Sequence, residues 1–459
     1  MSFTNKTKLY IFVRSKIQKR SILVYGKYEM EHKKIVVKWK EFRIPEVKKR
    51  MYDVNLSIDF IITISGPRRA GKTYFCFQLI NKLIDEGISR ENIFYVNFED
   101  NMLLGANADD LDEILDCYVE VSNINPTQKL YLFFDEIQTV NNWDSWARKI
   151  SDQRKDIKLI LTGSSSKLLS REISTKLRGR VINKEIFPLS FKETILWQNI
   201  SYNIKTLEFS RDKIIIKKDF LKYLVNGGYP ALFILNNLEH EQILQSYYDS
   251  MIFKDVIERY KIEEVNKLKT VAKLLFQSVS SEISYSKLTN KLKTAGFNMS
   301  KNTIIEYLSY FEDSYLFFIN FKYEYSLAKQ IGSIKKIYCI DNGLLNAVSF
   351  KFKEDVGKLL ENLVYIELRR RGNTIYRHKA NNDCDFIISD KNKVISAMQV
   401  TRKFDEENEH RELLGLVEAM KEHNLNTGLI LTEDQTQEKV IENKKILIKP
   451  VWQWLLEEV

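Results

Sequence analysis

The feature that most constrains how this 459-residue chain folds is a glycine-rich loop between two runs of different periodicity. The run DFIITISG at 59–66 is apolar and rich in isoleucine, which predicts a buried strand, and helical spacing of apolar residues over 72–86 predicts a helix. The sequence between them matches G-x-x-x-x-G-K-[ST], the pattern of a phosphate-binding loop. Its residues are Gly66, Pro67, Arg68, Arg69, Ala70, Gly71, Lys72 and Thr73.

Each position in this loop has a physical reason to hold a nucleoside triphosphate. The glycines let backbone N–H groups converge on the phosphates. Lys72 would reach the β- and γ-phosphates, and the hydroxyl of Thr73 would ligate Mg²⁺. The alternative is a glycine-rich turn that binds no ligand and whose lysine has no function, but this interpretation leaves the flanking strand and helix unexplained. We therefore expect ATP and Mg²⁺ to bind at residues 66–73.

An acidic pair at the end of a later strand predicts the second half of the same site. The stretch KLYLFFDEI at 129–137 has no polar residue between Tyr131 and Asp135. Asp135 would hold Mg²⁺ through water, and Glu136 would orient or deprotonate the attacking water. The alternative is two surface carboxylates that cap the next helix.

Weaker candidates lie at other strand ends and in a basic stretch. A strand at 156–165 ends in Thr-Gly-Ser-Ser, so Ser164 is a candidate sensor of the γ-phosphate. Arg178 and Arg180 are candidates for a charge clamp, acting in cis or from a neighbouring subunit, which would require oligomerisation. The pair at 99–100, Glu-Asp, is a further candidate contact to substrate or Mg²⁺. An ordinary turn and solvated arginines are the competing interpretations.

The order of elements predicts an α/β fold with several domains. Apolar strands alternate with helices over residues 50–205, which indicates a parallel P-loop sheet covered by helices on both faces. Helical patterns dominate 206–262. Residues 263–334 are predicted to form three helices, with serine N-caps at 284 and 300, followed by a hairpin, as in a winged helix. Mixed strands and helices follow at 335–459.

The positive charge of the chain is concentrated at its N-terminus. Residues 1–50 hold 15 Lys/Arg and 4 Asp/Glu, whereas the whole chain carries a net charge of +10. This basic segment, 1–49, either attracts phosphates of nucleic acid or of a membrane face, or is a solvated leader that packs on the next domain. We favour the second interpretation, because residues 22–25 and 35–39 read as short strands.

Targeting and redox signals are few. No stretch approaches 18 uncharged apolar residues, and the N-terminus has no secretory signal, so we expect a cytoplasmic protein without a membrane span. The four cysteines are far apart and form no C-x-x-C, which predicts neither disulfides nor a zinc site and suits a reducing compartment.

With these motifs in hand, the chain resembles a known family. The phosphate loop, LFFDEIQTVNNWDSWAR, LTGSSSKLLSREISTKLRGRV and FPLSFKE resemble the archaeal-type AAA+ ATPases. The segments NGGYP, FKDVIERY, KIYCIDNGLL and ENLVYIELRRRG resemble the C-terminal half of the same family, so the resemblance covers about residues 45–457. It implies an ASCE-type P-loop domain that uses ATP and Mg²⁺, a winged-helix element, and a C-terminal domain similar to PD-(D/E)xK restriction endonucleases.

The residues of the implied nuclease centre depart from its pattern. Glu361 would be the helix residue, Asp385 the strand aspartate, and Gln399 the first residue of the third motif. Thr401, however, stands where that motif needs a lysine. The next residue points to the opposite face of the strand, and Lys403 lies about 7 Å further along. We therefore expect a retained nuclease-like fold with impaired chemistry.

These observations predict an ATP-dependent switch or motor that acts on DNA or on a protein partner. The first alternative is a nucleotide-gated binding module without turnover, and the second is a Mg²⁺-dependent nuclease. The predicted recognition helix at 300–314 carries Lys301 but also Glu306, Glu312 and Asp313, so a structural role for the winged helix competes with DNA binding.

Overall fold

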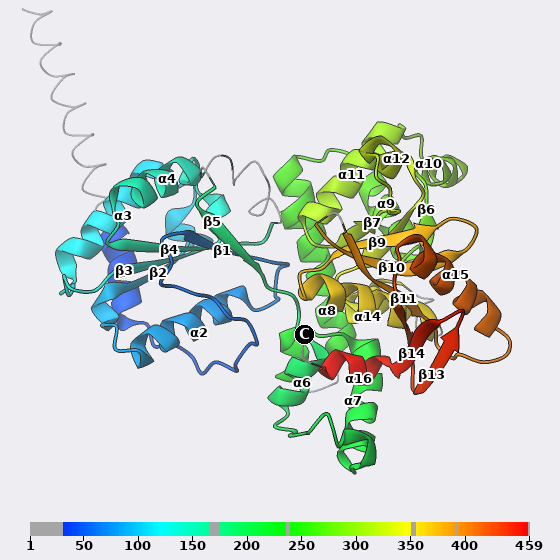
Figure 1. Ribbon diagram of the computed structural model, residues 1–459. Helices are drawn as coiled ribbons and strands as arrows, with labels where there is room; N and C mark the ends of the chain where they lie inside the picture. The colour runs from blue at the N-terminus through cyan, green and yellow to red at the C-terminus, as the bar shows by residue number, and fades with distance from the viewer. Residues whose placement is uncertain are drawn as a thin grey trace, which may run out of the picture.

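The computed structural model describes residues 31–165, 175, 177, 179–235, 239–349, 355–391 and 393–457. Two lobes make up this part of the chain. A P-loop lobe, coloured blue to teal, lies beside a larger lobe that runs from green to red (Figure 1). The predicted clamp residue Arg178 and most of the basic N-terminal segment lie outside the described residues.

The P-loop lobe is a five-stranded sheet in the order β2-β3-β4-β1-β5. All neighbouring pairs are parallel, which confirms the predicted parallel sheet. In Figure 1, α2 lies below the sheet and α3 and α4 lie above it. The bounds are β1 Ile61–Ser65, α2 Lys72–Asp85, β2 Ile93–Asn97, α3 Ala108–Val121, β3 Leu130–Asp135, α4 Trp143–Gln153, β4 Ile157–Gly163 and β5 Val181–Glu185.

Two features of this lobe differ from the sequence-based expectation. The expected strand at 35–39 is part of a helix that covers 31–41. Its apolar residues recur at helical spacing, and Trp39 is buried and donates a hydrogen bond of 2.7 Å to the carbonyl of Ile93. The edge strand β5 was not predicted, because its sequence VINKE is half-exposed and lacks an apolar run. The described end of the basic segment, residues 31–49, thus packs on the P-loop core through this helix.

The middle of the chain is helical, as predicted. The predicted N-caps are confirmed: Ser284 accepts a hydrogen bond from the N–H of Lys287, and Ser300 accepts one from that of Thr303. The elements are α6 Phe191–Trp197, α7 Asp212–Asn226, α8 His240–Ser250, the π-helix η8 Met251–Glu258, α9 Val265–Phe276, β6 Glu282–Ile283, α10 Tyr285–Thr294, α11 Lys301–Asp313, β7 Phe317–Asn320, α12 Leu327–Gly332 and β8 Lys335–Cys339.

The last part of the chain forms a mixed six-stranded sheet in the order β13-β14-β12-β11-β10-β9. The short strands β13 and β14 and helix α16 were not predicted from the sequence. The bounds are α13 Asn342–Val348, α14 Val356–Arg370, β9 Thr374–Lys379, β10 Asp383–Asp390, β11 Lys393–Val400, α15 Glu409–Glu422, β12 Thr427–Thr432, β13 Gln437–Ile441, β14 Lys444–Pro450 and α16 Val451–Leu456.

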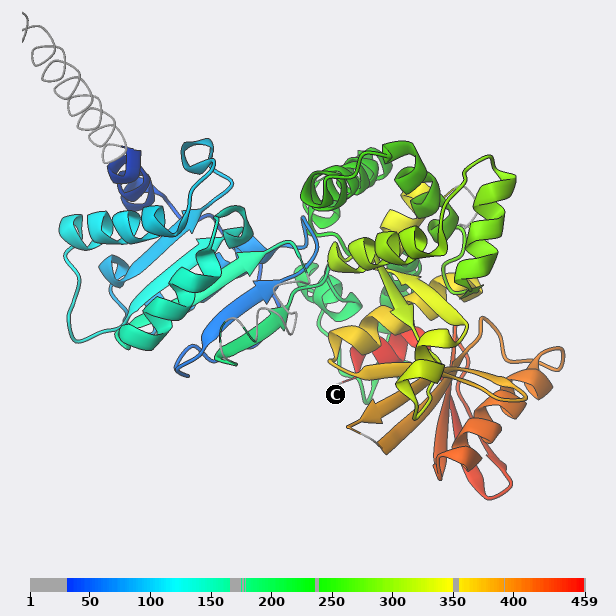
Figure 2. The ribbon, with the colours of Figure 1, turned by 90° about the horizontal axis from the view of Figure 1, so that it is seen from above.

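The hydrophobic cores explain why the second lobe is one body. One continuous core runs from α6 through the middle helices to α14 and α16, and a separate core fills the P-loop sheet. The three-stranded sheet β6-β8-β7 connects the middle helices to the C-terminal domain, since β8 lies between β6 and β7 while α14 contacts it. Seen from above, the two lobes meet through a narrow region near the phosphate loop (Figure 2). Among the described helices, none is long and apolar enough to cross a membrane.

Candidate functional site

The phosphate loop connects β1 to α2 and requires glycine at both ends. Gly66 has φ +152°, and a Cβ there would lie 2.1 Å from the carbonyl oxygen of Ile186. Gly71 has φ +96° and is the N-cap residue of α2. Because glycine has no side chain to cap the first turn, the amides of that turn are left to bind an anion.

Lys72 lies at the base of this loop, facing the acidic pair. Its Nζ donates to the carbonyl oxygens of Gly66 and Pro67, at 3.1 and 3.2 Å, and lies 3.5 Å from Glu136 Oε1. Glu136 has φ 55°, a left-handed conformation that is uncommon outside glycine and turns its side chain toward the loop. The amide of Gln138 donates to the other Glu136 oxygen at 2.6 Å. The acidic pair at the end of β3 therefore faces the loop, which fits a water-activating role for Glu136.

Asp135 accepts hydrogen bonds from three hydroxyl groups. Thr73 Oγ1 and Tyr95 OH donate to Asp135 Oδ2 at 2.7 and 2.8 Å, and Thr162 donates to the other oxygen. Thr162 also accepts a bond of 3.1 Å from the N–H of Glu136, so the ends of β2, β3 and β4 form one network with α2. Two oxygen ligands of the kind Mg²⁺ prefers, from Thr73 and Asp135, thus lie side by side.

The two carboxylates of the pair differ in acidity. Burial and the neighbouring charge of Glu136 raise the pKa of Asp135. Burial alone would raise the pKa of Glu136 as well, but the Lys72 ammonium and the hydrogen bond from Gln138 lower it overall. Glu136 therefore stays ionised, as a group that accepts a proton from water must be.

Ser164, the predicted sensor, contacts the second lobe. Its Oγ donates to Asp255 Oδ1 at 2.9 Å and accepts from Arg259 at 3.2 Å. Asp255 also accepts a bond of 2.8 Å from Arg68 of the phosphate loop and is completely buried. The guanidinium of Arg68 reaches Glu99 as well, at 2.8 Å. A carboxylate from the π-helix η8 thus joins the phosphate loop to the predicted sensor.

The remaining predicted residues of this site lie elsewhere. Arg180 directly precedes β5 and forms an ion pair with Asp152. It therefore lies at the amino ends of the parallel strands, whereas the phosphate loop follows the carboxyl end of β1. This position is at odds with a charge clamp in cis, because the carboxyl ends of the strands carry the site. Asp100 caps a short turn and pairs with Lys38, while Glu99 contacts the site through Arg68.

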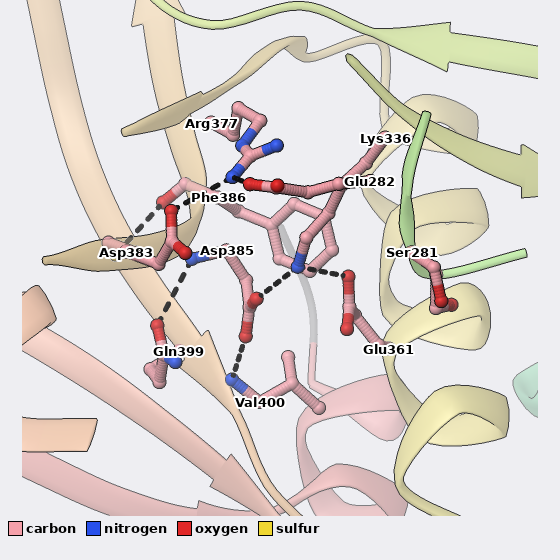
Figure 3. Close-up of polar contacts among 12 residues, drawn as sticks. Ser281, Glu282, Lys336, Glu361, Arg377, Asp383, Asp385, Phe386, Gln399 and Val400 are labelled. Atoms are coloured by element: carbon pink, nitrogen blue, oxygen red, sulfur yellow. Dashed lines mark hydrogen bonds and ion pairs between the residues drawn. The ribbon is translucent and has the colours of Figure 1, made fainter. Parts of the chain in front are cut away.

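A second buried cluster of charged residues lies in the C-terminal domain (Figure 3). Glu361 of α14 and Asp385 of β10 face each other, and Lys336 of β8 lies between them. Its Nζ is 2.9 Å from Glu361 Oε1 and 2.7 Å from Asp385 Oδ1. Tyr338 OH donates to the same Glu361 oxygen at 2.7 Å, and the N–H of Val400 donates to Asp385 at 3.0 Å. Burial and the charge of Asp385 raise the pKa of Glu361 to about 7, although Lys336 opposes the shift.

Gln399 lies beside this cluster and is held by hydrogen bonds at both ends of its amide. Its Oε1 accepts from the N–H of Asp385 at 3.0 Å, and its Nε2 donates to Glu412 at 2.5 Å. Thr401 is buried and donates to the carbonyl of Lys403, while exposed Arg402 pairs with Glu433. The predicted triad of Glu361, Asp385 and Gln399 is brought together, as its motif spacing indicated.

The sequence-based reasoning missed five residues that complete these two clusters. They are Tyr95, Thr162, Asp255, Arg259 and Lys336. Tyr95 and Thr162 lie near the ends of predicted strands, so the parallel arrangement already carried a signal for them. The other three lie within FKDVIERY and KIYCIDNGLL, two segments that carried the family resemblance, but nothing in those segments pointed to a role for the individual residues.

Comparisons with known proteins agree with this architecture. A model of the AAA domain matches residues 59–195, and a model of a domain of unknown function (DUF8612) matches residues 217–355. The chain is 38% identical over 430 residues to the uncharacterized protein MJ1544 of Methanocaldococcus jannaschii, covering 90% of this chain and 91% of that protein. It is 30% identical over 339 residues to an uncharacterized protein of Haemophilus influenzae, covering 73% and 81% of the two chains.

Among solved structures, the Walker-type ATPase paby2304 of Pyrococcus abyssi is 12% identical, with a TM-score of 0.39 and coverage of 67% of this chain and 99% of that one. The Orc1 protein of Aeropyrum pernix, solved in complex with DNA, is 11% identical, with a TM-score of 0.30 and coverage of 71% and 92%.

The loop, the sheet order and the acidic pair define an AAA-type P-loop ATPase domain, joined to a helical region and a C-terminal mixed α/β domain. Within that class, the chain belongs to the same family as the uncharacterized Methanocaldococcus protein, with which it shares nearly its whole length.

Proposed function

We propose that this protein is a Mg²⁺-dependent ATPase that uses hydrolysis to switch the contacts between its two lobes. The observation that carries the proposal is the arrangement around the phosphate loop. Lys72 Nζ lies 3.5 Å from Glu136, and Thr73 lies 2.7 Å from Asp135. Lys72 would bind the β- and γ-phosphates, and Glu136 would take a proton from the attacking water.

The residues present fit a bound Mg²⁺. Thr73 and Asp135 would hold the ion, which supplies charge neutralisation for the β- and γ-phosphate oxygens when bound. Tyr95 and Thr162 hold the Asp135 carboxylate through its two oxygens, so its orientation is fixed before any nucleotide arrives. Such preorganisation lowers the reorganisation cost of the reaction.

The contact between the lobes gives the switch a physical basis. Arg68 of the phosphate loop and Ser164 of the β4 end both bind Asp255, and the hydroxyl of Tyr315 donates to Ser65, the last residue of β1, at 2.9 Å. A γ-phosphate near Arg68 would compete with Asp255 for this guanidinium. We propose that the nucleotide state thereby changes how η8 and the C-terminal domain sit against the phosphate loop. This change would alter how the protein acts on DNA or on a protein partner.

Nucleotide binding tests this proposal. Fluorescent ATP should bind the full chain with Mg²⁺ present, and Lys72→Ala should abolish that binding. Arg154→Ala should bind like the wild type, because Arg154 is exposed on the same lobe and its ion pair is with Asp156. A folded protein that ignores ATP and GTP alike would rule the ATPase out, whereas binding followed by at most one hydrolysed ATP per chain would favour the nucleotide-gated module.

A second function is favoured by Lys336. We propose that the C-terminal domain has a restriction-endonuclease-like fold and that β8 supplies the ammonium group absent from position 401. Lys336 contacts both carboxylates that such a centre needs, although it lies on a strand of the adjoining three-stranded sheet. In that position the ammonium would stabilise charge on a phosphate during cleavage of nucleic acid.

Plasmid nicking with Mg²⁺ or Mn²⁺ tests this second function. The wild type should nick at high protein concentration, and both Lys336→Ala and Asp385→Asn should lose the activity, with Lys393→Ala as an exposed control. If the wild type does not nick plasmid DNA, the nuclease proposal is wrong. Lys336 then has a structural role, as the cation between two buried carboxylates.

A further inference from the structure

A third cluster of ionisable residues lies on the other side of strand β9, away from Lys336. His378 of β9 faces the C-terminal end of α15, where Glu422 and His423 follow each other in the chain. One ligand atom from each of the three side chains lies within 4.8 Å of the others. Neither the ATPase site nor the Lys336 cluster includes any of these groups.

His378 is the buried member of this cluster. It is 3% exposed, and its Nε2 has no hydrogen-bond partner among the described residues. Its Nδ1 lies 3.7 Å from Glu422 Oε2, and its Nε2 lies 3.5 Å from Glu418 Oε1. Two ligand atoms of a tetrahedral ion with bonds of 2.0–2.1 Å lie about 3.4 Å apart. The distance between His378 Nδ1 and Glu422 Oε2 is close to this value.

Glu418 has the position of an orienting carboxylate. An imidazole that binds a metal through one nitrogen nearly always donates its other N–H to a carboxylate or carbonyl. Glu418 is itself fixed, because it accepts hydrogen bonds from the N–H groups of Asn381 and Asn382 at 2.9 and 3.1 Å. Its Oε1 lies 3.5 Å from the unbonded Nε2, so a small shift of the ring would let Glu418 accept that N–H and hold Nδ1 toward Glu422.

His423 completes the cluster from the helix end. Its ring lies edge-on to those of Tyr323 and His378, with centroids 5.0 and 6.0 Å away, and its buried Nε2 has no hydrogen-bond partner among the residues that the structure describes. Glu422 and His423 also line an open cavity of about 590 Å³, together with Tyr323 and Lys393. An ion could reach the cluster from solvent through this cavity.

We propose that His378, Glu422 and His423 bind one divalent transition-metal ion of the Zn²⁺ class. Two imidazoles and one carboxylate suit Zn²⁺, Co²⁺ or Ni²⁺ far better than Mg²⁺, which prefers oxygen ligands. Three protein ligands leave a fourth position open toward the cavity. The site is independent of the ATPase and of the Lys336 cluster.

Among the described residues, one other cluster competes for such an ion and is less suited to it. His32 lies 3.5 Å from Asp110 and 3.1 Å from Glu113. It offers a single imidazole, and its Asp110 is already committed to the N-cap of α3, where it accepts from the N–H of Asn107 at 2.8 Å. A soft ion should therefore prefer the pair of histidines.

Titration of the untagged full chain with ZnCl₂, in competition with a chromophoric chelator, tests the proposal. We expect one Zn²⁺ per chain, with affinity reduced more than about 100-fold by His423→Gln and about 10- to 100-fold by Glu418→Gln, as for a ligand and its orienting partner. His410→Gln is the matched control, because His410 is exposed on the same helix and should bind like the wild type.

Two further measurements separate a real site from adventitious binding. Co²⁺ should give visible d–d absorption in the wild type and in His410→Gln, and lose it in His423→Gln. Zn²⁺ should raise the Tm of the wild type but not of His423→Gln, since only the wild type binds the ion in its folded state. The proposal is overturned if His423→Gln binds Zn²⁺ as the wild type does, if His32→Gln alone removes the ion, or if no stoichiometric binding occurs.

Discussion

The part of the chain that the structure describes holds a buried cluster around Lys72 and another around Lys336, in each of which the lysine faces carboxylates, and the two are built in different ways. In the P-loop lobe, Lys72 belongs to the motif that also supplies Thr73, and it lies 3.5 Å from Glu136. In the C-terminal domain, Lys336 contacts Glu361 and Asp385 at 2.9 and 2.7 Å, from a strand of the adjoining sheet. The first cluster lies beside backbone amides that Gly71 leaves without a side-chain cap, whereas in the second the ammonium itself occupies the position between the carboxylates.

The two lysines therefore differ in role, because the groups around them differ in how many hydrogen bonds they already make. Around Lys72, the amides of the first turn of α2 have no side-chain cap from Gly71. Around Lys336, each carboxylate already accepts a hydrogen bond from a second donor, Tyr338 or the N–H of Val400. We therefore expect the first lysine to matter most for activity and the second most for stability.

The largest effect is expected from Lys72→Ala. Loss of the ammonium that faces the phosphates should lower kcat/KM for ATP at least about 100-fold, while Tm falls only by the part that the ion pair with Glu136 contributes. Steady-state release of phosphate and a thermal melt measure the two quantities. Lys82→Ala is the control, since Lys82 is exposed on the same helix and its nearest acidic partner, Glu86, is 3.9 Å away. If Lys72→Ala lost stability but kept ATP turnover, the proposed difference between Lys72 and Lys336 would be wrong.

Lys336→Met should have the opposite signature. It leaves two buried carboxylates without their cation, which typically costs about 3–5 kcal/mol, although protonation of Glu361 would recover part of this. Urea unfolding followed by tryptophan fluorescence should show the loss, and ATP turnover per folded molecule should stay near that of the wild type. Adding Glu361→Gln and Asp385→Asn to Lys336→Met should restore much of the stability, and a failure to do so would remove the electrostatic explanation.

Asp255→Asn sharpens the comparison by releasing the phosphate loop from the second lobe. Arg68 and Arg259 would lose the carboxylate that competes with phosphate, so ATP affinity should rise severalfold, on the order of 1 kcal/mol. Isothermal titration with a non-hydrolysable ATP analogue measures it. Asp249→Asn, an exposed change on α8, should leave affinity unchanged. Unchanged or weaker binding by Asp255→Asn would mean that Asp255 is not a competitor of the γ-phosphate.

The smallest effect concerns pH and distinguishes the two glutamates. The pKa of Glu361 is raised to about 7, so its contribution to stability is present below pH 4.5 and lost as pH rises through 7. The pKa of Glu136 is lowered, so its contribution is present above pH 4.5 and lost as pH falls through its folded-state pKa. Between pH 5 and 8, Tm of Glu361→Gln should therefore fall less than that of the wild type. If the Tm of Glu361→Gln changed with pH in parallel with that of the wild type, the raised pKa assigned to Glu361 would be wrong.

Residues close together in sequence were the predictable part of the fold and the site. The strand–loop–helix at 61–85 and the acidic pair at 135–136 follow from local patterns, because each is one run of residues with one geometry. The helices α10 and α11 were predictable for the same reason, through their serine caps. The motif at 399–401 supplies no lysine from its own strand, and the impaired chemistry that it predicts stays a prediction.

Contacts between distant elements were not predictable. Lys336 precedes Glu361 by 25 residues and Asp385 by 49, and no pattern in its own strand points to either. Asp255, which contacts Arg68 of the phosphate loop, lies in a π-helix that no periodicity signalled. Arg180 precedes β5, an unpredicted edge strand beside β1, so it lies at the amino ends of the strands, whereas the phosphate loop follows the carboxyl end of β1.

The most direct test of the central claim is Glu136→Gln assayed with radiolabelled ATP and Mg²⁺, alongside the wild type. The account predicts that this variant binds ATP about as tightly as the wild type and loses turnover by about 100- to 10,000-fold, because the group that takes the proton from water is gone. Normal turnover by Glu136→Gln would contradict the assigned site.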